Sequence, residues 1–191
     1  KMIFSRYDIP CFLSEKTAAA EHPLVLTILS ALDILAGGFR YESMFAYLKT
    51  GFSNITAQEA DLLENYVLAT GVTRRAWFDE KPWRYKSDFS TQEAQANEQI
   101  DEIRRRVVAP LVRLREGIGS KRTVKEACAA VYTFVCDLGM GARVQNMVEA
   151  FRQEGDFVLA NRYSRIWNSI LNILDQMVLT AGERKIGMEQ F

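Results

Sequence analysis

The helical spacing of apolar residues is the feature that most constrains how this chain folds. Side chains three or four residues apart share one face of an α-helix, and such stripes follow one another along most of the sequence. They run from Val25 to Leu35, Ile100 to Leu114, Val124 to Leu138 and Val144 to Phe151, with a long final helix near Asp156 to Thr180. The sequence therefore predicts an all-α fold, a bundle of about seven helices.

Local signals mark where several of these helices begin. In a capping box, a Ser or Thr hydroxyl accepts a hydrogen bond from the backbone N–H three residues later, and the Glu at that position accepts one in return. Three such pairs occur: Thr56 with Glu59, Ser90 with Glu93, and Thr123 with Glu126. Pro110 lies inside one apolar stripe and is expected to kink or divide its helix, because proline has no backbone N–H.

The same spacing assigns side chains to the core. Cys128 and Cys136 are predicted to be buried on one helix face, since neither they nor Cys11 show the C-x-x-C spacing of a metal or redox site. The only segment that favours a strand is Ile9 to Leu13, which Pro10 interrupts, so one short strand-like segment is expected. In the final helix the predicted inward residues are Tyr163, Ile166, Trp167, Ile170, Ile173 and Met177.

Composition narrows the functional class. The 191 residues are 48% hydrophobic and 11% aromatic, which is enough to form a core. The 24 Lys and Arg are balanced by 24 Asp and Glu, whereas a free-standing nucleic-acid-binding domain usually has a basic excess. No apolar run approaches the roughly 20 residues that span a bilayer, and no signal peptide is recognisable. We therefore expect a soluble, cytoplasmic protein without membrane contact.

No catalytic, cofactor-binding or metal-binding site is predicted. Gly117 to Lys121 is the string nearest to a phosphate-binding loop, but its spacing is wrong and it follows a helix rather than a strand. The lone His22 precedes Pro23 without carboxylate or cysteine partners, so a structural role at a helix start is expected. A cluster of acidic residues is interpreted as a solvated helix face: Asp88, Glu93, Glu98, Asp101 and Glu102.

Two basic segments are candidates for contact with DNA or with a protein partner. The first is the irregular stretch from Gly71 to Ser90, where basic residues alternate with aromatic ones. That composition is typical of stacking on unpaired bases combined with backbone contact, and equally of a loop held in place by its tryptophans. Its candidate residues are Arg74, Arg75, Trp77, Lys81, Trp83, Arg84 and Lys86.

The second basic segment runs from Arg104 to Lys125 and has eight basic residues against one acid, Glu116. Such a stripe could contact DNA phosphates and release their counterions. It could equally pair with the preceding acidic cluster or with a partner subunit. Its candidate residues are Arg104, Arg105, Arg106, Arg113, Arg115, Lys121 and Arg122.

Several strings together resemble one protein family. They are Ile3-Phe4 with Tyr7-Asp8-Ile9-Pro10, His22-Pro23-Leu24 with Ser30-Ala31-Leu32-Asp33, Tyr47-Leu48-Lys49-Thr50-Gly51, and Leu62-Leu63-Glu64-Asn65-Tyr66-Val67, followed by Gly71 and Trp77. In this order they resemble AddB, a component of the AddAB (RexAB) helicase–nucleases. The resemblance spans nearly the whole chain and is most specific up to Trp77.

The resemblance implies that the chain is an internal piece of a larger protein, as its start at Lys1 in mid-pattern also suggests. Residues 1–16 would be a border segment of a RecA-like domain, residues 17–182 a helical insertion similar to subdomain 2B of superfamily-1 helicases, and residues 183–191 a second border. The family is implied to be an ATP-dependent helicase and exonuclease of DNA repair and recombination. It would use ATP, magnesium and an iron–sulfur cluster, all bound outside this segment.

The expected function is therefore that of a non-catalytic helical accessory domain, which guides DNA or packs against the partner AddA-type helicase/nuclease subunit. No cofactor and no small-molecule substrate are expected for the segment itself. A protein-interaction scaffold that docks on AddA without touching DNA is the alternative. An independent enzyme with an unrecognised site is the third hypothesis.

Overall fold

The computed structural model describes residues 19–83, 91–119 and 122–187, except for the side chains of Arg75 and of residues 91–97. The prediction of an all-α fold with about seven helices is confirmed for this part of the chain. Its elements are α3 (Pro23–Gly37), α4 (Tyr41–Leu48), α5 (Ala57–Thr70), the 3₁₀ helix η1 (Arg74–Phe78), α6 (Thr91–Ile118), β1 (Arg122–Thr123), α7 (Val124–Asp137), α8 (Met140–Gln153), α9 (Phe157–Ala181) and β2 (Lys185–Ile186).

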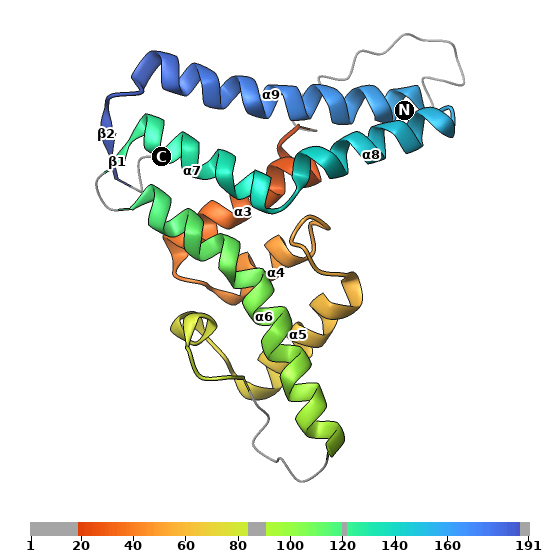
Figure 1. Cartoon of the computed structure of the whole chain (residues 1–191), viewed down its shortest axis with the longest axis vertical. Helices are drawn as coiled ribbons and strands as arrows, with labels where there is room; N and C mark the ends of the chain where they lie inside the picture. Colours follow the sequence, from red (N-terminus) through yellow and green to blue (C-terminus); the bar gives the residue numbers. More distant parts are fainter. Residues whose placement is uncertain (1–18, 84–90, 120–121, 188–191) are drawn as a thin grey trace, which may run out of the picture.

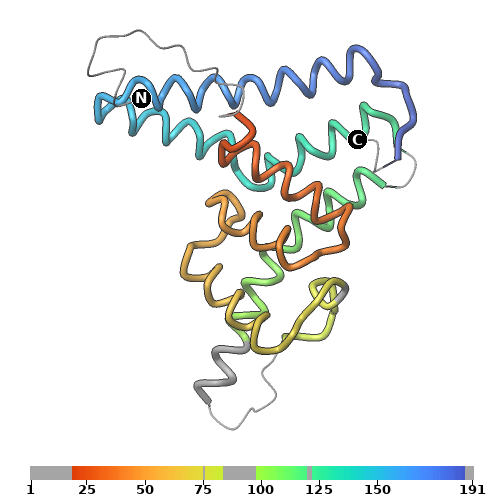
Figure 2. The backbone as a smooth tube through the Cα atoms, turned by 180° about the vertical axis from the view of Figure 1, so that it is seen from behind, coloured from red at the N-terminus to blue at the C-terminus, as the bar shows by residue number. Residues whose placement is uncertain are grey.

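The helices form an upper layer and a stem (Figure 1). In the layer, α9 lies along α8 and α7, and α3 crosses beneath them. The stem is α6, which packs on α7 at its upper end and on α5 and η1 lower down. Seen from behind, α5 lies beside the lower part of the stem, and α4 lies above α5, next to α3 (Figure 2). The two parts of the molecule are joined where α6 packs on α7 and where α4 packs on α3.

The sequence signals for helix starts are confirmed wherever they can be tested. In both described capping boxes, Glu59 N–H donates to the Thr56 hydroxyl and Glu126 N–H donates to the Thr123 hydroxyl, each over 3.2 Å. The Glu carboxylates accept in return from the backbone N–H of the two threonines over 2.8 Å. The Ser90–Glu93 pair lies outside the described residues. The final helix begins one residue after Asp156, close to its predicted start.

Pro110 does not divide its helix, since α6 continues through it to Ile118. The predicted apolar stripe explains why the helix continues. Five side chains along it are each no more than 2% exposed, so their burial on both sides of the proline outweighs the one hydrogen bond that proline removes. They are Ile100, Ile103, Val107, Leu111 and Leu114.

Three predicted burial assignments are wrong. Cys128 is buried but Cys136 is exposed, because eight residues at 100° per residue rotate the second cysteine by about 80° from the first. Ile173 is 58% exposed, at the edge of the face that α9 turns away from the core. Asp101 is only 7% exposed rather than part of a solvated acidic face, because it forms a buried ion pair with Arg104.

Two short strands were not predicted. Arg122 pairs with Ile186 and Thr123 with Lys185 in an antiparallel ladder. The N–H of Val124 donates to the Arg184 carbonyl over 3.0 Å, so the chain after α9 also satisfies a free N–H at the start of α7. Two-residue strands have no period that a sequence could reveal. The strand-like segment predicted at Ile9 to Leu13 lies outside the described residues.

Within the described ranges, no single helix is long and apolar enough to cross a membrane. Helices α7 and α8 meet that test only as a pair, across a bend of 54°. Both helices contribute residues to the hydrophobic core, Val131 and Val135 from α7 and Val144 and Val148 from α8.

Candidate functional site

The aromatic segment from Gly71 onward folds inward onto α6. Trp77 is 1% exposed and Trp83 is 5% exposed. Their ring centroids are 4.8 Å apart, and the Trp83 ring stacks on Tyr66 at 5.2 Å with an interplanar angle of 14°. Because the two indole rings pack in the core, the tryptophans hold this segment in place, which is the second of the two interpretations that the sequence allowed.

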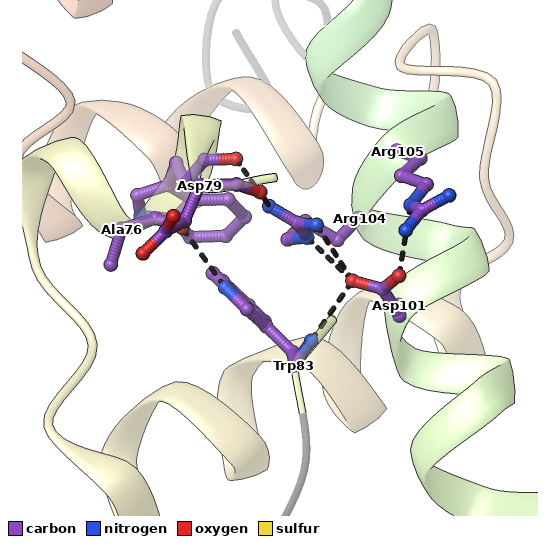
Figure 3. Close-up of polar contacts among 7 residues, drawn as sticks. Ala76, Asp79, Trp83, Asp101, Arg104 and Arg105 are labelled. Carbon is purple, nitrogen blue, oxygen red and sulfur yellow. Dashed lines mark hydrogen bonds and ion pairs between the residues drawn. The ribbon is translucent and has the colours of Figure 1, made fainter. Parts of the chain in front are cut away.

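A buried ion pair on α6 holds the backbone of the segment at Trp83 (Figure 3). Asp101 Oδ1 lies 2.7 Å from Arg104 Nη2 and accepts a hydrogen bond from Arg104 Nε over 2.9 Å. The same oxygen accepts the backbone N–H of Trp83 over 3.0 Å. The other oxygen, Oδ2, lies 2.8 Å from Nε of Arg105. Asp101 is buried because all of these donors converge on it.

Arg104 reaches from α6 into the backbone of the aromatic segment. Its Nη1 donates to the carbonyls of Trp77 and Asp79 over 2.9 and 2.8 Å, and its guanidinium lies 5.2 Å from the Trp83 ring centre. The Trp83 indole N–H donates to the Ala76 carbonyl over 2.9 Å, as Figure 3 shows. Arg104 thus satisfies backbone carbonyls that burial would otherwise leave without donors.

Three candidate contact residues are therefore structural in the folded domain. Trp77 and Trp83 cannot stack on a base, and Arg104, at 3% exposure, cannot reach a phosphate without local unfolding. The sequence could not separate them from their exposed neighbours, because burial here depends on α6 lying against the segment. Of the other candidates in this segment, Arg74 and Lys81 are exposed. Arg84, Lys86 and the side chain of Arg75 lie outside the described residues.

The exposed arginines of the second basic segment have partners within the fold. Arg105 pairs with Asp101, Arg106 with Glu59, Arg113 with Asp137 at 2.7 Å, and Arg122 with Glu126 at 3.5 Å. Arg115 lies 4.4 Å from the centre of the Phe78 ring. Ion pairs on the surface contribute little to stability, so a phosphate or a partner carboxylate could replace the carboxylates of the exposed pairs. Lys121 lies outside the described residues.

A groove between η1 and α6 lies beside these residues. Its volume is about 570 Å³, and its apolar floor includes Phe78, Val108 and Val112. Asp79 and Glu80 line one side, while Arg105 and Arg115 belong to the α6 side. Sequence reasoning missed the two acids, because it considered only the cations of the segment. A rim of mixed sign favours a protein partner over a polyanion.

The described residues contain no group of three or more His, Cys, Asp or Glu that could hold a metal ion. His22 has the structural role predicted for it, since its Nδ1 accepts the N–H of Leu24 over 3.4 Å at the start of α3. Its ring meets Tyr163 edge-on at 4.5 Å. Burial, and then the nearby charge of Arg162, lower the pKa of His22.

No family model matches the chain. Several curated relatives do match it closely, and each is named as the B subunit of an ATP-dependent helicase/deoxyribonuclease. The protein of Clostridioides difficile strain 630 is 40% identical over 195 residues and that of Clostridium botulinum strain Loch Maree 38%, each over 99% of this chain. The protein of Caldanaerobacter subterraneus subsp. tengcongensis is 37% identical over the whole chain. The chain spans 17% of the length of these relatives.

Proposed function

The chain corresponds to one region of the B subunits of ATP-dependent helicase/deoxyribonucleases, and we propose that it is a non-catalytic accessory domain that packs against a protein partner there. The observation that carries this proposal is the groove between η1 and α6, with an apolar floor and charges of both signs on its rim. Each charged side of the rim would meet the opposite charge on a complementary surface, and the floor would be buried.

The role proposed for the longer protein is supported by the relatives' name and by the family resemblance of the sequence. It would process DNA ends in recombination and repair in the cytoplasm, with an AddA-type subunit as its partner. ATP, magnesium and an iron–sulfur cluster would be bound by other regions of that complex. The present region would be a helical insertion of the 2B type, flanked by the proposed border segments 1–16 and 183–191. Nuclease and ATPase assays of the isolated chain with magnesium would give no turnover if the domain is non-catalytic.

Guidance of DNA is the second candidate function, and the position of two arginines favours it. Arg106 and Arg113 lie seven residues apart on α6 and therefore share one face. Their side chains are 42% and 52% exposed. Their carboxylate partners, Glu59 and Asp137, would have to release them for contact with phosphates. Packing is preferred because it requires no such exchange.

A matched pair of substitutions tests the packing role in the full-length subunit. Ala109 is exposed, lies mid-helix in α6 and lines the groove, while Ala142 is exposed on α8 and lies outside it. Ala109→Glu should weaken binding of the partner subunit at least tenfold, and Ala142→Glu should leave it unchanged. Equal affinity for the two variants would reject the groove as the packing site.

Fluorescence anisotropy with forked, duplex and single-stranded DNA separates the two functions. If the domain guides DNA, Arg106→Ala with Arg113→Ala should lower the affinity of the assembled complex and flatten its salt dependence by about two counterions. Arg152→Ala, on α8, is the control for loss of an exposed arginine. Unchanged affinity and salt slope in the double variant would leave packing as the function.

A further inference from the structure

Helix α9 buries few of its side chains, although many of them are apolar. It has 25 residues, but only Ala160 and Ile170 are buried. Figures 1 and 2 show α9 along the upper edge of the described part of the chain, with α8 and α7 on its inner side. Four inward side chains, Tyr163, Ile166, Trp167 and Leu174, are partly buried against the core. The helix is therefore held from one side only among the described residues.

The exposed residues of α9 form one continuous face. At 100° per residue, all thirteen of them fall within an arc of about 160°, and the other twelve residues occupy the rest of the helix. This outer face consists of Phe157, Val158, Asn161, Arg162, Arg165, Asn168, Ser169, Asn172, Ile173, Asp175, Gln176, Leu179 and Thr180.

The outer face of α9 carries few charges for a face turned to water. Three of its thirteen residues are charged, and none is Lys or Glu. In the described side chains of α6, by contrast, seven of nine exposed residues are charged. Protein interfaces are depleted in Lys, Glu and Asp and retain Arg. The composition of the outer face is thus that of an interface rather than of a solvated helix.

Large apolar side chains lie at both ends of this face. Phe157 is 62% exposed and Val158 is 78% exposed in the first turn, and Leu179 is 82% exposed in the last. With Ile173, α9 holds four of the nine large hydrophobic residues that are exposed in the described part of the chain. Val158 and Leu179 are about 31 Å apart along the helix axis. A partner that covers both must extend along most of α9.

We propose that the outer face of α9 packs against another region of the same, longer polypeptide, which presents an apolar and uncharged polar surface to it. The proposal rests on the assignment of the chain to one region of a larger helicase/deoxyribonuclease component. Because the chain spans 17% of its relatives, most of each relative lies outside the matched region. Interfaces between domains of one chain are more polar than obligate interfaces between subunits, as this face is.

A partner region in the same polypeptide can stay bound to a face that is only partly apolar, because the chain keeps the two regions close together. The effective concentration of a tethered partner reaches the millimolar range, so a modest apolar contribution is sufficient. A DNA duplex fits the face less well, since only Arg162 and Arg165 are cationic and Asp175 opposes them. The apolar residues at both ends would gain nothing from phosphates.

Thiol labelling of the full-length subunit tests the proposal. Ser169 lies within the outer face and is replaced by Cys, and the control is Glu149→Cys on the exposed side of α8. Both are made with Cys136→Ser, and labelling is read by mass spectrometry of the peptide. In the subunit alone, Cys at position 169 should be labelled at least tenfold more slowly than Cys at position 149, and urea should abolish the difference.

Equal labelling rates at the two positions would overturn the proposal. Protection of position 169 that needs added DNA, or the added partner subunit, would overturn it as well, because the occupant would then be a different macromolecule. Protection that is lost on dilution would identify a second copy of the chain and would also contradict it. The groove variants test affinity for the partner subunit, so either proposal can fail while the other stands.

Discussion

Arg104 and Asp101, one turn apart on α6, form a buried ion pair whose Nη2–Oδ1 distance is 2.7 Å. The pair connects α6 to the aromatic segment, since Asp101 accepts the N–H of Trp83 and Arg104 donates to the carbonyls of Trp77 and Asp79. The two tryptophans of the aromatic segment, Trp77 and Trp83, are therefore part of the core. This relationship leads to the first prediction.

Replacing Arg104 with Met should lower the free energy of unfolding by about 3–5 kcal/mol, because it leaves a buried carboxylate without its main partner. Trp77 and Trp83 should become more exposed, with red-shifted emission at intermediate urea concentrations. Arg105→Met is the control and should change stability by about 1 kcal/mol or less, since its side chain is 61% exposed. Equal losses in both variants would show that burial of the pair is not the cause.

Replacing Tyr47 with Phe should stabilise the domain. The Tyr47 side chain is fully buried, its hydroxyl has no hydrogen-bond partner among the described residues, and burial raises the pKa of the phenol. Removing an unsatisfied buried hydroxyl should raise the free energy of unfolding by up to about 1 kcal/mol. Tyr41→Phe, which loses an exposed hydrogen bond to Glu64, should not stabilise. Urea unfolding measures both, and a less stable Tyr47→Phe variant would contradict the prediction.

Stability should fall as the pH drops below about 6.5, the ordinary pKa of histidine. The pKa of His22 is lowered by burial and then by Arg162, so the unfolded chain takes up a proton there before the folded one does. The loss begins as the pH passes below the unfolded pKa and is complete below the folded pKa. His22→Asn keeps an N-cap without titrating. Urea unfolding from pH 7.5 to 5.5 should show this loss in the wild type, and the same slope in the variant would contradict it.

The capping box of α7 should contribute measurably to stability. Thr123→Ala removes the side-chain acceptor for the N–H of Glu126 and should cost about 1 kcal/mol. The pKa of Glu126 is lowered first by the backbone N–H of Thr123 and then by its hydroxyl. Because the variant keeps the N–H and loses the hydroxyl, this pKa should rise only part of the way to its ordinary value in NMR titration. Thr133→Ala, on the exposed side of the same helix, is the matched control and should cost nothing.

Gly117 should be required where α6 meets α7. A Cβ at position 117 would lie 2.5 Å from the Cβ of Ala130, closer than two carbon atoms can pack. Gly117→Ala should therefore destabilise the domain, although Ala is normally better than Gly in a helix by about 1 kcal/mol. Adding Ala130→Gly should restore part of the loss in thermal unfolding. Additive effects of the two substitutions would argue against the contact.

Several features of the fold could be predicted because they depend on neighbours three or four residues away. The capping hydrogen bonds of Thr56 and Thr123 and the buried stripe of α6 are of this kind. Predictions of which side chains of a helix are buried were less accurate, because they depend on how the helix is rotated against its neighbours. Cys136 and Ile173 follow helical spacing, but Cys136 is exposed and Ile173 is 58% exposed. Periodicity gives the existence of a face, not its exact rotation.

In the candidate site, too, the sequence predicted local features but not those that depend on how the helices pack. Composition identified the basic and aromatic segments, and the groove between η1 and α6 does lie there. It could not show that Arg104 is buried while Arg105 is exposed, because consecutive residues of a helix point 100° apart and only the position of η1 decides which one is covered. Nor could it show that Asp79 and Glu80 line the same groove as Arg105 and Arg115 of α6.

The sequence by itself determined the helices, most of their starts and the absence of a recognisable catalytic motif, since capping, periodicity and turn chemistry are local. Only the tertiary structure decided which cations are paired, which tryptophans are buried and which face of α9 the described residues leave uncovered. These properties depend on segments far apart in the chain, such as Arg106 with Glu59 and Trp83 with Asp101. Their energies come from burial and convergence of charges, which exist only once the helices have packed.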